Sequence, residues 1–305
     1  MCVPSQDRTP RFVVVSPVRD EAQYLERTIG SMVRQSIRPV QWILVNDGST
    51  DGTAEIINRW AQKEPWIVAV HRDNQARQTE IATPSRGMRA RQAKEIEAFY
   101  AGFAKISDPD WDFLVKLDGD LGFESDFFQK CLTEFATDPR LGISGGTICH
   151  EIDGALQVEP VPHFHVRGAT KIYRRACWDD IGGVVRGAGW DTLDEVKANM
   201  LGWSTRSSPN NVMHYRFTGA ANGNWQNAVK NGIWSHICGY HPLYMLLRCG
   251  NAIFHKPYLI GAAGLMYGFV LGKVQGVPMA DDAKTVRFLR QQQLRRMCFR
   301  TSVWK

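Results

Sequence analysis

Hydrophobic runs and amphipathic segments alternate along the first part of the chain. Three short apolar runs predict strands that are covered on both faces. They lie at residues 12–15, 40–45 and 113–117. Apolar residues recur at helical spacing after each of the first two runs, namely Leu25, Ile29 and Met32, and then Ile56, Ile57 and Trp60. This alternation predicts a parallel sheet flanked by helices, and ligands of such sheets bind beyond the carboxyl ends of the strands.

The pattern changes after about residue 216, where aromatic residues accompany apolar stretches at residues 233–247 and 258–271. The second stretch is short of the roughly 20 residues that span a bilayer, so we expect a buried, re-entrant or interfacial helix. An ordinary helical hairpin is the alternative. Gly264, Gly268 and Gly272 stand four residues apart, a spacing that lets another helix approach closely. A basic helix follows, which either lies on anionic lipid or presents a solvated face.

Composition narrows the class of protein only in part. The 305 residues are 44% hydrophobic, enough to bury a full core. A net charge of +6 favours anionic partners, which include nucleotide phosphates, lipid headgroups and nucleic acid. The seven cysteines are scattered and the first 12 residues lack an apolar segment, so a cytosolic protein without a disulfide framework is the simpler expectation.

Two motifs follow the first two predicted strands. Pro17-Val18-Arg19-Asp20-Glu21 ends the first strand, and a carboxylate there either binds ribose or base or caps the next helix. The run DGSTDGT at residues 47–53 ends the second strand. Its glycines allow a tight turn, and Asp47 is placed to bind a uracil-like base or ribose. A plain turn with a helix cap would explain Asp51 and Thr53, but not Asp47.

The third motif, Lys116-Leu117-Asp118-Gly119-Asp120, closes the third strand. Alternate residues of an extended segment point to the same side, so we expect Asp118 and Asp120 to share one Mg²⁺ or Mn²⁺ ion. Such an ion would neutralise the charge that grows on a leaving nucleoside diphosphate. A surface turn with two acidic residues is the alternative reading of this motif.

The fourth motif places Asp191, Asp194 and Glu195 before or within a predicted helix. At i, i+3 and i+4 they share one face of its first turn. They either complement the helix dipole or supply a general base that removes the proton from an acceptor hydroxyl. Asp191 is the first choice for this base, and Asp194 is the second.

In combination and order, these motifs resemble the family 2 glycosyltransferases of the GT-A fold, over roughly residues 11–216. The resemblance implies an inverting single displacement with Asp191 as the base. The family commonly has Glu-Asp at the base position, whereas this chain has Trp190-Asp191. Counting back from Gly202 aligns Asp191 with the usual Asp, but the nearby Asp194-Glu195 pair keeps the assignment open.

The resemblance also implies a donor site and a metal site. The residues expected at the donor nucleotide are Pro17, Arg19, Glu21, Asp47, Lys116 and Asp118. The residues expected at the metal are Asp118, Asp120 and His214, although a lone histidine also serves structural roles.

Other residues are weaker candidates. We expect pyrophosphate contacts among Arg72, Arg86, Arg89 and Arg91, unless these arginines are solvated. Gly145 and Gly146 are expected to leave room for the sugar or acceptor. Residues 163–168, which include His163 and His165, resemble a flexible loop on the acceptor side.

We therefore expect a GT-A domain with a mostly parallel sheet at residues 1–220 and a helical region at residues 221–305 that contacts a membrane. The expected enzyme moves a sugar from a UDP-, GDP- or TDP-linked donor to a hydroxyl acceptor. That acceptor would be lipid-linked or a polysaccharide, at the inner face of the cell membrane, in cell-surface glycan biosynthesis.

Three other classes compete with this interpretation. A nucleotidyltransferase would need a glycine-rich, lysine-bearing phosphate loop where SPVRDE stands. A catalytically silent protein that binds a nucleotide-sugar or lipid would not need the full set of aspartates. A nucleic-acid binder would fit the basic pI, but the chain has no recognisable motif for one.

Overall fold

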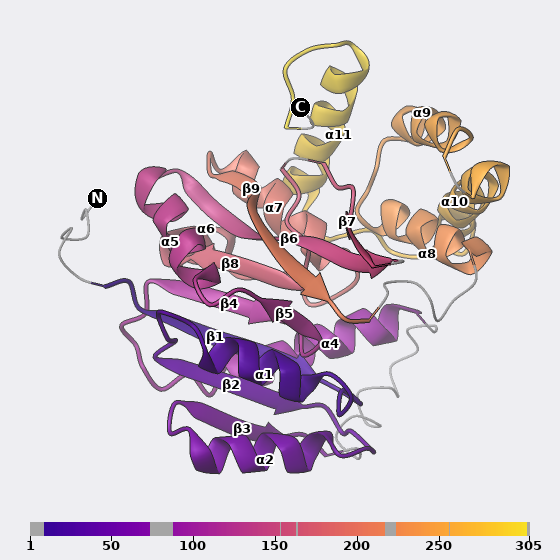
Figure 1. The fold of residues 1–305 in the computed structure, drawn as a ribbon. Coiled ribbons are helices and arrows are strands. Elements are labelled where there is room, and N and C mark those ends of the chain that lie inside the picture. Colours follow the sequence, from indigo (N-terminus) through magenta and orange to yellow (C-terminus); the bar gives the residue numbers. More distant parts are fainter. Residues whose placement is uncertain are drawn as a thin grey trace.

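The computed structural model describes residues 9–73, 88–152, 154–162, 164–216, 224–255 and 257–303. They form one mixed sheet with helices on both faces, followed by a group of helices at one end of the sheet (Figure 1). The strands are β1 (Phe12–Val18), β2 (Gln41–Asn46), β3 (Ile67–His71), β4 (Phe113–Leu117), β5 (Leu121–Phe123), β6 (Leu141–Ile152), β7 (Ala155–Val158), β8 (Thr170–Arg174) and β9 (Ser204–His214). The helices are α1 (Leu25–Val33), α2 (Thr53–Lys63), α4 (Met88–Phe103), α5 (Phe127–Thr137), α6 (Arg175–Ile181), α7 (Trp190–Met200), α8 (Asn224–Ile237), α9 (Pro242–Ala252), α10 (Tyr258–Val274) and α11 (Ala283–Met297).

The strand order is β3-β2-β1-β4-β8-β6-β9-β5, with β7 paired to β6. The first four strands are parallel, as the alternation of strands and helices predicts. The other half differs from the expected mostly parallel sheet, because β8 runs antiparallel to both β4 and β6. No apolar run or crossover helix in the sequence marks this reversal. The sequence pattern that predicts the parallel strands therefore does not predict the direction of β8.

The parallel strands are buried on both faces because their residues alternate between two cores. Phe12 and Val14 of β1 belong to a core with α1 and α5, and Val13 and Val15 belong to a core with α4 and α6. All four side chains are at most 1% exposed. The continuous apolar run of β1 therefore follows from its central position in the sheet.

The C-terminal helices form around a close contact between α8 and α10. A Cβ added to Gly268 would lie 2.0 Å from the carbonyl oxygen of Val229 on α8, and one added to Gly264 would lie 2.8 Å from the Cβ of Ala228. The predicted use of these glycines for a close helix approach is thus confirmed. Among the described residues, no helix is long and apolar enough to cross a membrane.

The basic helix α11 packs on the rest of the protein with its apolar face. Val286 and Leu289 are buried, and the Arg290 guanidinium donates to the carbonyl oxygen of Gly239. The expected domain boundary at residue 220 lies in residues 217–223, outside the described part of the chain. The division into residues 1–220 and 221–305 therefore stays a prediction.

Candidate active site

The first two motifs meet at the carboxyl ends of β1 and β2 and brace one another. Asp20 accepts from the backbone N–H of Thr50 at 2.8 Å, and Asp51 accepts from the backbone N–H of Ala22 at 3.0 Å. Thr53 accepts from the backbone N–H of Glu21. Asp51 and Thr53 thus connect the two loops, and Asp51 also accepts from the backbone N–H of Thr53 at 3.0 Å at the start of α2.

Asp47 joins the two loops through its backbone, because its N–H donates to the carbonyl oxygen of Val18 at 2.9 Å. Its carboxylate is 9% exposed and pairs with Arg72 at 2.6 Å. Of the four arginines expected near the pyrophosphate, Arg72 is therefore at the donor motif. Arg86 lies outside the described residues, as do the side chains of Arg89 and Arg91.

The remaining residues of the first motif differ in exposure. Pro17 is half-buried within β1, while Arg19 is exposed and pairs with its neighbour Asp20 at 3.2 Å. Glu21 is 13% exposed and pairs with Arg216 at 2.6 Å. Burial, together with the charge of Asp120, raises the pKa of Glu21 to about 8 against the lowering effect of Arg216.

Lys116 forms a buried cluster at the end of β4. Its ammonium, only 2% exposed, pairs with Asp118 and, at 2.5 Å, with Glu95 of α4. Partial burial raises the pKa of Glu95 against the lowering effect of Lys116, and the negative charges of Asp118 and Asp191 raise it further. Glu95 thus anchors the lysine of the third motif, although no motif in the sequence points to it.

Asp120 faces a different set of partners. Its carboxylate lies 3.2 Å from Nε2 of His214 and 3.6 Å from Arg216. The alternation that would have aligned Asp118 with Asp120 ends with β4 at Leu117, and the chain bends at Gly119. A Cβ at Gly119 would lie 2.6 Å from Val18, so the bend packs tightly against β1.

These residues allow a test of whether a divalent ion would fit. Among the described residues, no group of three or more His, Cys, Asp or Glu side chains is arranged to hold a metal. The Asp120–His214 pair nevertheless supplies one hard oxygen and one imidazole nitrogen side by side. Mg²⁺ in nucleotide enzymes takes only one or two protein ligands and completes its shell with phosphate oxygens and water. The pair fits an ion that is held jointly by protein and diphosphate.

The fourth motif forms the first turns of α7, where Lys171 of β8 separates the roles of the acidic residues. The side chain of Lys171 has no solvent exposure. Its ammonium contacts the carboxylates of Asp194 and Glu195 at 2.8 Å each, and these two side chains have no exposure either. It also donates to the backbone carbonyl of Asp191 at 2.5 Å. Asp191 itself is partly exposed at the start of the helix.

Further contacts complete the network around Lys171. Tyr173 donates to Asp194 at 2.7 Å, and Glu195 accepts from the backbone N–H of Val166 and lies 2.9 Å from Nδ1 of His165. Burial raises the pKa of Asp194 to about 6 although Lys171 lowers it. Burial lowers the pKa of His165, but the adjacent Glu195 outweighs it and the pKa is raised.

Trp190 stands between the two lysine clusters. Its indole is 3% exposed, and its ring centroid lies 5.2 Å from the ammonium of Lys116 and 5.5 Å from that of Lys171. Both distances suit cation–π attraction. The residue that departs from the Glu-Asp pattern is thus an apolar contact that both lysines share, next to Asp191.

The structure changes the interpretation of two glycines, Gly145 and Gly146. A Cβ at Gly145 would lie 2.0 Å from the carbonyl oxygen of Thr170, and one at Gly146 would lie 2.3 Å from Val212. Both glycines therefore serve the packing of β6 against its neighbours, and the expectation that they leave room for a sugar is wrong. Gly168 does approach Asp191, because its Cβ would lie 3.5 Å from that of Asp191. His163 of the same loop lies outside the described residues.

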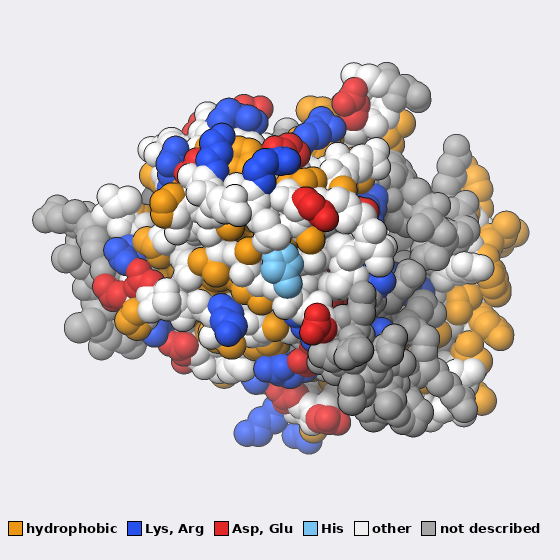
Figure 2. All heavy atoms as spheres, turned by 90° about the horizontal axis from the view of Figure 1, so that it is seen from below, with side chains coloured by type: hydrophobic (Ala, Val, Ile, Leu, Met, Phe, Trp, Pro, Cys, Tyr) orange, Lys and Arg blue, Asp and Glu red, His pale blue; other side chains and the backbone are white. Residues whose placement is uncertain are grey.

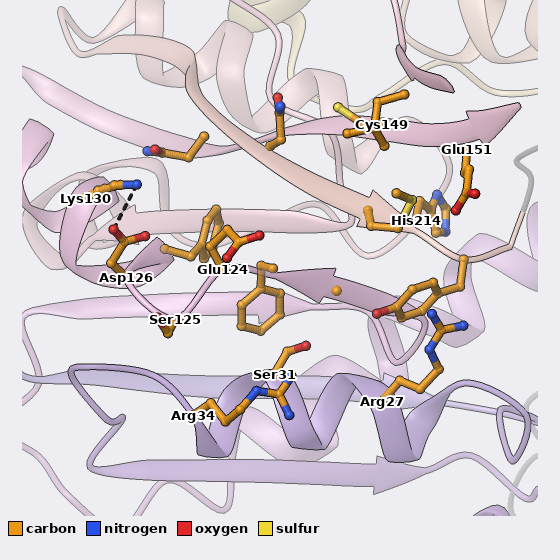
Figure 3. A pocket seen from close by; sticks show the side chains of 18 of the residues that line it. Arg27, Ser31, Arg34, Glu124, Ser125, Asp126, Lys130, Cys149, Glu151 and His214 are labelled. Carbon is orange, nitrogen blue, oxygen red and sulfur yellow. Dashed lines mark ion pairs between the residues drawn. The ribbon is translucent and has the colours of Figure 1, made fainter. Parts of the chain in front are cut away.

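A groove of about 990 Å³ opens along α1 beside this region (Figure 3). Lys130 and Asp126 stand at one end and His214 and Glu151 at the other, with Arg27 and Arg34 along α1. Asp47, Asp118 and Asp191 are not among the residues that line it. The groove reaches His214 of the candidate metal pair, but Asp120 is not among its lining residues.

The sequence is similar to known glycosyltransferases. Residues 13–82 match the profile of the family described as Glycosyl transferase family 2. The resemblance to family 2 glycosyltransferases is confirmed. The chain is 26% identical over 135 residues to a hyaluronan synthase of Pasteurella multocida and 29% identical over 140 residues to the uncharacterized glycosyltransferase EpsJ of Bacillus subtilis. These alignments cover 44% and 45% of this chain, but only 12% and 33% of the two relatives.

The fold of the domain is shared with solved GT-A glycosyltransferases, as the sequence predicts. The mannosyltransferase PcManGT of Pyrobaculum calidifontis, solved with GDP-Man and Mn²⁺, superposes with a TM-score of 0.58 at 17% sequence identity. The match covers 90% of each chain, so it extends beyond the motif-bearing residues. At this identity the likeness establishes the fold, and the chemistry must be argued from the side chains.

Proposed function

We propose that this glycosyltransferase domain transfers a sugar from a nucleotide-sugar donor to an acceptor hydroxyl with inversion at the anomeric carbon. The observation that carries the proposal is the arrangement around α7. Asp191 is a partly exposed carboxylate at the helix start, held by Lys171 through its backbone, while Asp194 and Glu195 are consumed by internal contacts. A base must reach its proton, and only the first of these three carboxylates has exposure.

The other motifs supply the donor site in this proposal. Asp47, beside Arg72, binds the base or ribose, with Pro17, Arg19 and Glu21 forming the opposite loop. Lys116 and Asp118 lie where the diphosphate and donor sugar would meet. Asp120 and His214 would hold a Mg²⁺ or Mn²⁺ ion, which would neutralise the charge of the leaving diphosphate when bound. PcManGT, solved with Mn²⁺ and GDP-Man, supports a donor and ion of this kind.

The residues of this chain then act in one displacement. Asp191 accepts the proton of the acceptor hydroxyl as its oxygen forms a bond to the anomeric carbon and the bond to the diphosphate breaks. Lys171 fixes the first turn of α7 by its bond to the carbonyl oxygen of Asp191. The buried carboxylates of Asp194 and Glu195 hold that lysine in place, so they position the base without contacting the substrate.

We further propose that the acceptor is lipid-linked or a polysaccharide, handled at the inner face of the cell membrane during cell-surface glycan biosynthesis. The support is the apolar C-terminal helical region and the similarity to a hyaluronan synthase. A catalytically silent nucleotide-sugar-binding protein is the competing function, and it predicts donor binding without turnover.

Calorimetric titration of UDP, GDP and TDP, with and without Mn²⁺, tests the donor site. We expect one nucleotide to bind in a Mn²⁺-dependent manner, and Asp120→Asn to weaken that binding by about 10- to 100-fold. Asp179→Asn is the matched control, because this carboxylate is 63% exposed on α6. Binding that ignores both Mn²⁺ and the Asp120 substitution would contradict the proposed ion site, and no binding at all would contradict the proposed function.

A further inference from the structure

The C-terminal helices α9 and α10, and the turn between them, expose large apolar side chains. On α9, Leu243, Leu246 and Leu247 are 52%, 57% and 56% exposed, at the i, i+3 and i+4 spacing of one helix face. Beyond α9, Phe254 is 79% exposed, and on α10 Leu259 and Ile260 are 67% and 56% exposed. We call these six residues the α9–α10 tip. In Figure 2, hydrophobic side chains gather at the edge of the molecule where these helices lie in Figure 1.

This surface is not what holds the helices together. The contact of α10 with α8 uses the opposite kind of residue, the glycines at 264 and 268, which are buried. Met245 and Leu265 form the small core between α9 and α10. The apolar side chains of the tip therefore add nothing to internal packing, and an exposed apolar surface of this kind marks a site of interaction.

Charge indicates which partner covers the tip. The sequence contains no Asp or Glu from residue 196 to residue 280, whereas Lys230, Arg248, Lys256 and Lys273 fall within or beside the C-terminal helices. Apolar side chains accompanied only by cations are complementary to anionic lipid headgroups above an acyl layer.

We propose that the α9–α10 tip inserts into the interfacial layer of an anionic phospholipid bilayer. With 17 residues, α10 is about 25 Å long, and no described helix can cross a membrane, so the hairpin lies in one leaflet. Helices α8 to α10 stand at the end of the sheet where β1 and β2 finish (Figure 1). Docking by the tip therefore brings the candidate active site near the bilayer, which deepens the proposed use of a lipid-linked acceptor and rests on it.

Vesicle sedimentation tests this surface directly. Wild-type protein should sediment with vesicles of phosphatidylcholine and phosphatidylglycerol far more than with phosphatidylcholine alone, and less at high salt. Phe254→Ser combined with Leu259→Ser should weaken this binding at least tenfold. Val158→Ser is the matched control, because Val158 is 57% exposed on β7, outside the tip. It should bind as wild type does.

Three outcomes would overturn the proposal. Wild-type protein could stay in the supernatant with both kinds of vesicle, or the double variant could bind as tightly as wild type. Light scattering could instead show a wild-type dimer that the double substitution dissociates, without vesicle binding, in which case a second copy covers the tip. Nucleotide binding by the double variant should equal that of wild type, which separates a failure of docking from a failure of the proposed function.

Discussion

Lys171 gives the acidic residues of α7 different roles, because it pairs with the side chains of Asp194 and Glu195 but only with the backbone of Asp191. An ammonium with no exposure is tolerated only where carboxylates compensate its charge, and Asp194 and Glu195 do so at 2.8 Å each. Burial lowers the pKa of Lys171, but these two carboxylates outweigh it and the pKa is raised. Lys171 is therefore charged at neutral pH, and its contacts anchor the helix that presents Asp191.

Replacing Lys171 with Met tests this role. The substitution leaves two buried carboxylates without their ammonium partner, so the free energy of unfolding should fall by about 3–5 kcal/mol. Lys197→Met is the matched control, because Lys197 lies on α7 with 33% exposure and only a 3.7 Å ion pair to Asp282. That variant should change stability by less than about 1 kcal/mol.

Urea denaturation followed by circular dichroism measures both variants. Equal stability of Lys171→Met and wild type would show that the buried cluster does not anchor α7.

At this scale the sequence predicts the motif residues but not their partners. Asp47, Asp118, Asp120 and Asp191 stand at strand or helix ends where short spacings can be recognised. No such spacing marks their partners Glu95, Lys171, His165 and Arg216. The roles of these residues come from contacts between segments far apart in the chain, such as the 2.5 Å ion pair of Glu95 with Lys116. The tight packing of Gly145 cannot be predicted from the sequence either, because a glycine is expected both beside a ligand and beside a closely packed strand.

Among the elements, α10 shows most clearly how a spacing in the sequence becomes a contact. Glycines four residues apart align on one helix face, and at Gly268 this face comes so near α8 that a Cβ would lie 2.0 Å from the Val229 carbonyl oxygen. The reversed direction of β8 has no such signature in the sequence. Its pairing between β4 and β6 is set by the tertiary fold.

Gly268→Ala should lower the melting temperature, because the added methyl group must push the two helices apart, at a cost of about 1–3 kcal/mol. Gly250→Ala on α9 is the control, since a Cβ there meets nothing within 4 Å. This control should be neutral or stabilising by up to about 1 kcal/mol, through the better helix propensity of alanine. If Gly268→Ala melted no lower than Gly250→Ala, the close contact between α8 and α10 would be contradicted.

For the whole molecule, the alternation of strands and helices predicts the parallel half of the sheet, and the motif order predicts the resemblance to family 2 glycosyltransferases. The C-terminal region is predicted as an apolar helical region with a close helix contact and a membrane-facing side, but the residues of that side are not predicted. Whether its apolar residues face the protein or a partner depends on which face the glycines occupy, and that is settled by packing. The structure turns the glycines inward and the α9–α10 tip outward, which leaves the tip exposed for the docking that we propose.

The central claim is that Asp191 is the base of a nucleotide-sugar-dependent transfer. The most direct measurement is the rate of nucleoside diphosphate release from a panel of UDP-, GDP- and TDP-sugars with Mn²⁺ and lipid fractions as acceptor, for wild type, Asp191→Asn and the control Asp179→Asn. We expect release from one donor, slowed by about 10²- to 10⁴-fold in Asp191→Asn while nucleotide binding persists, and unchanged in Asp179→Asn. Release at the wild-type rate by Asp191→Asn, or no release from any donor, would contradict the account.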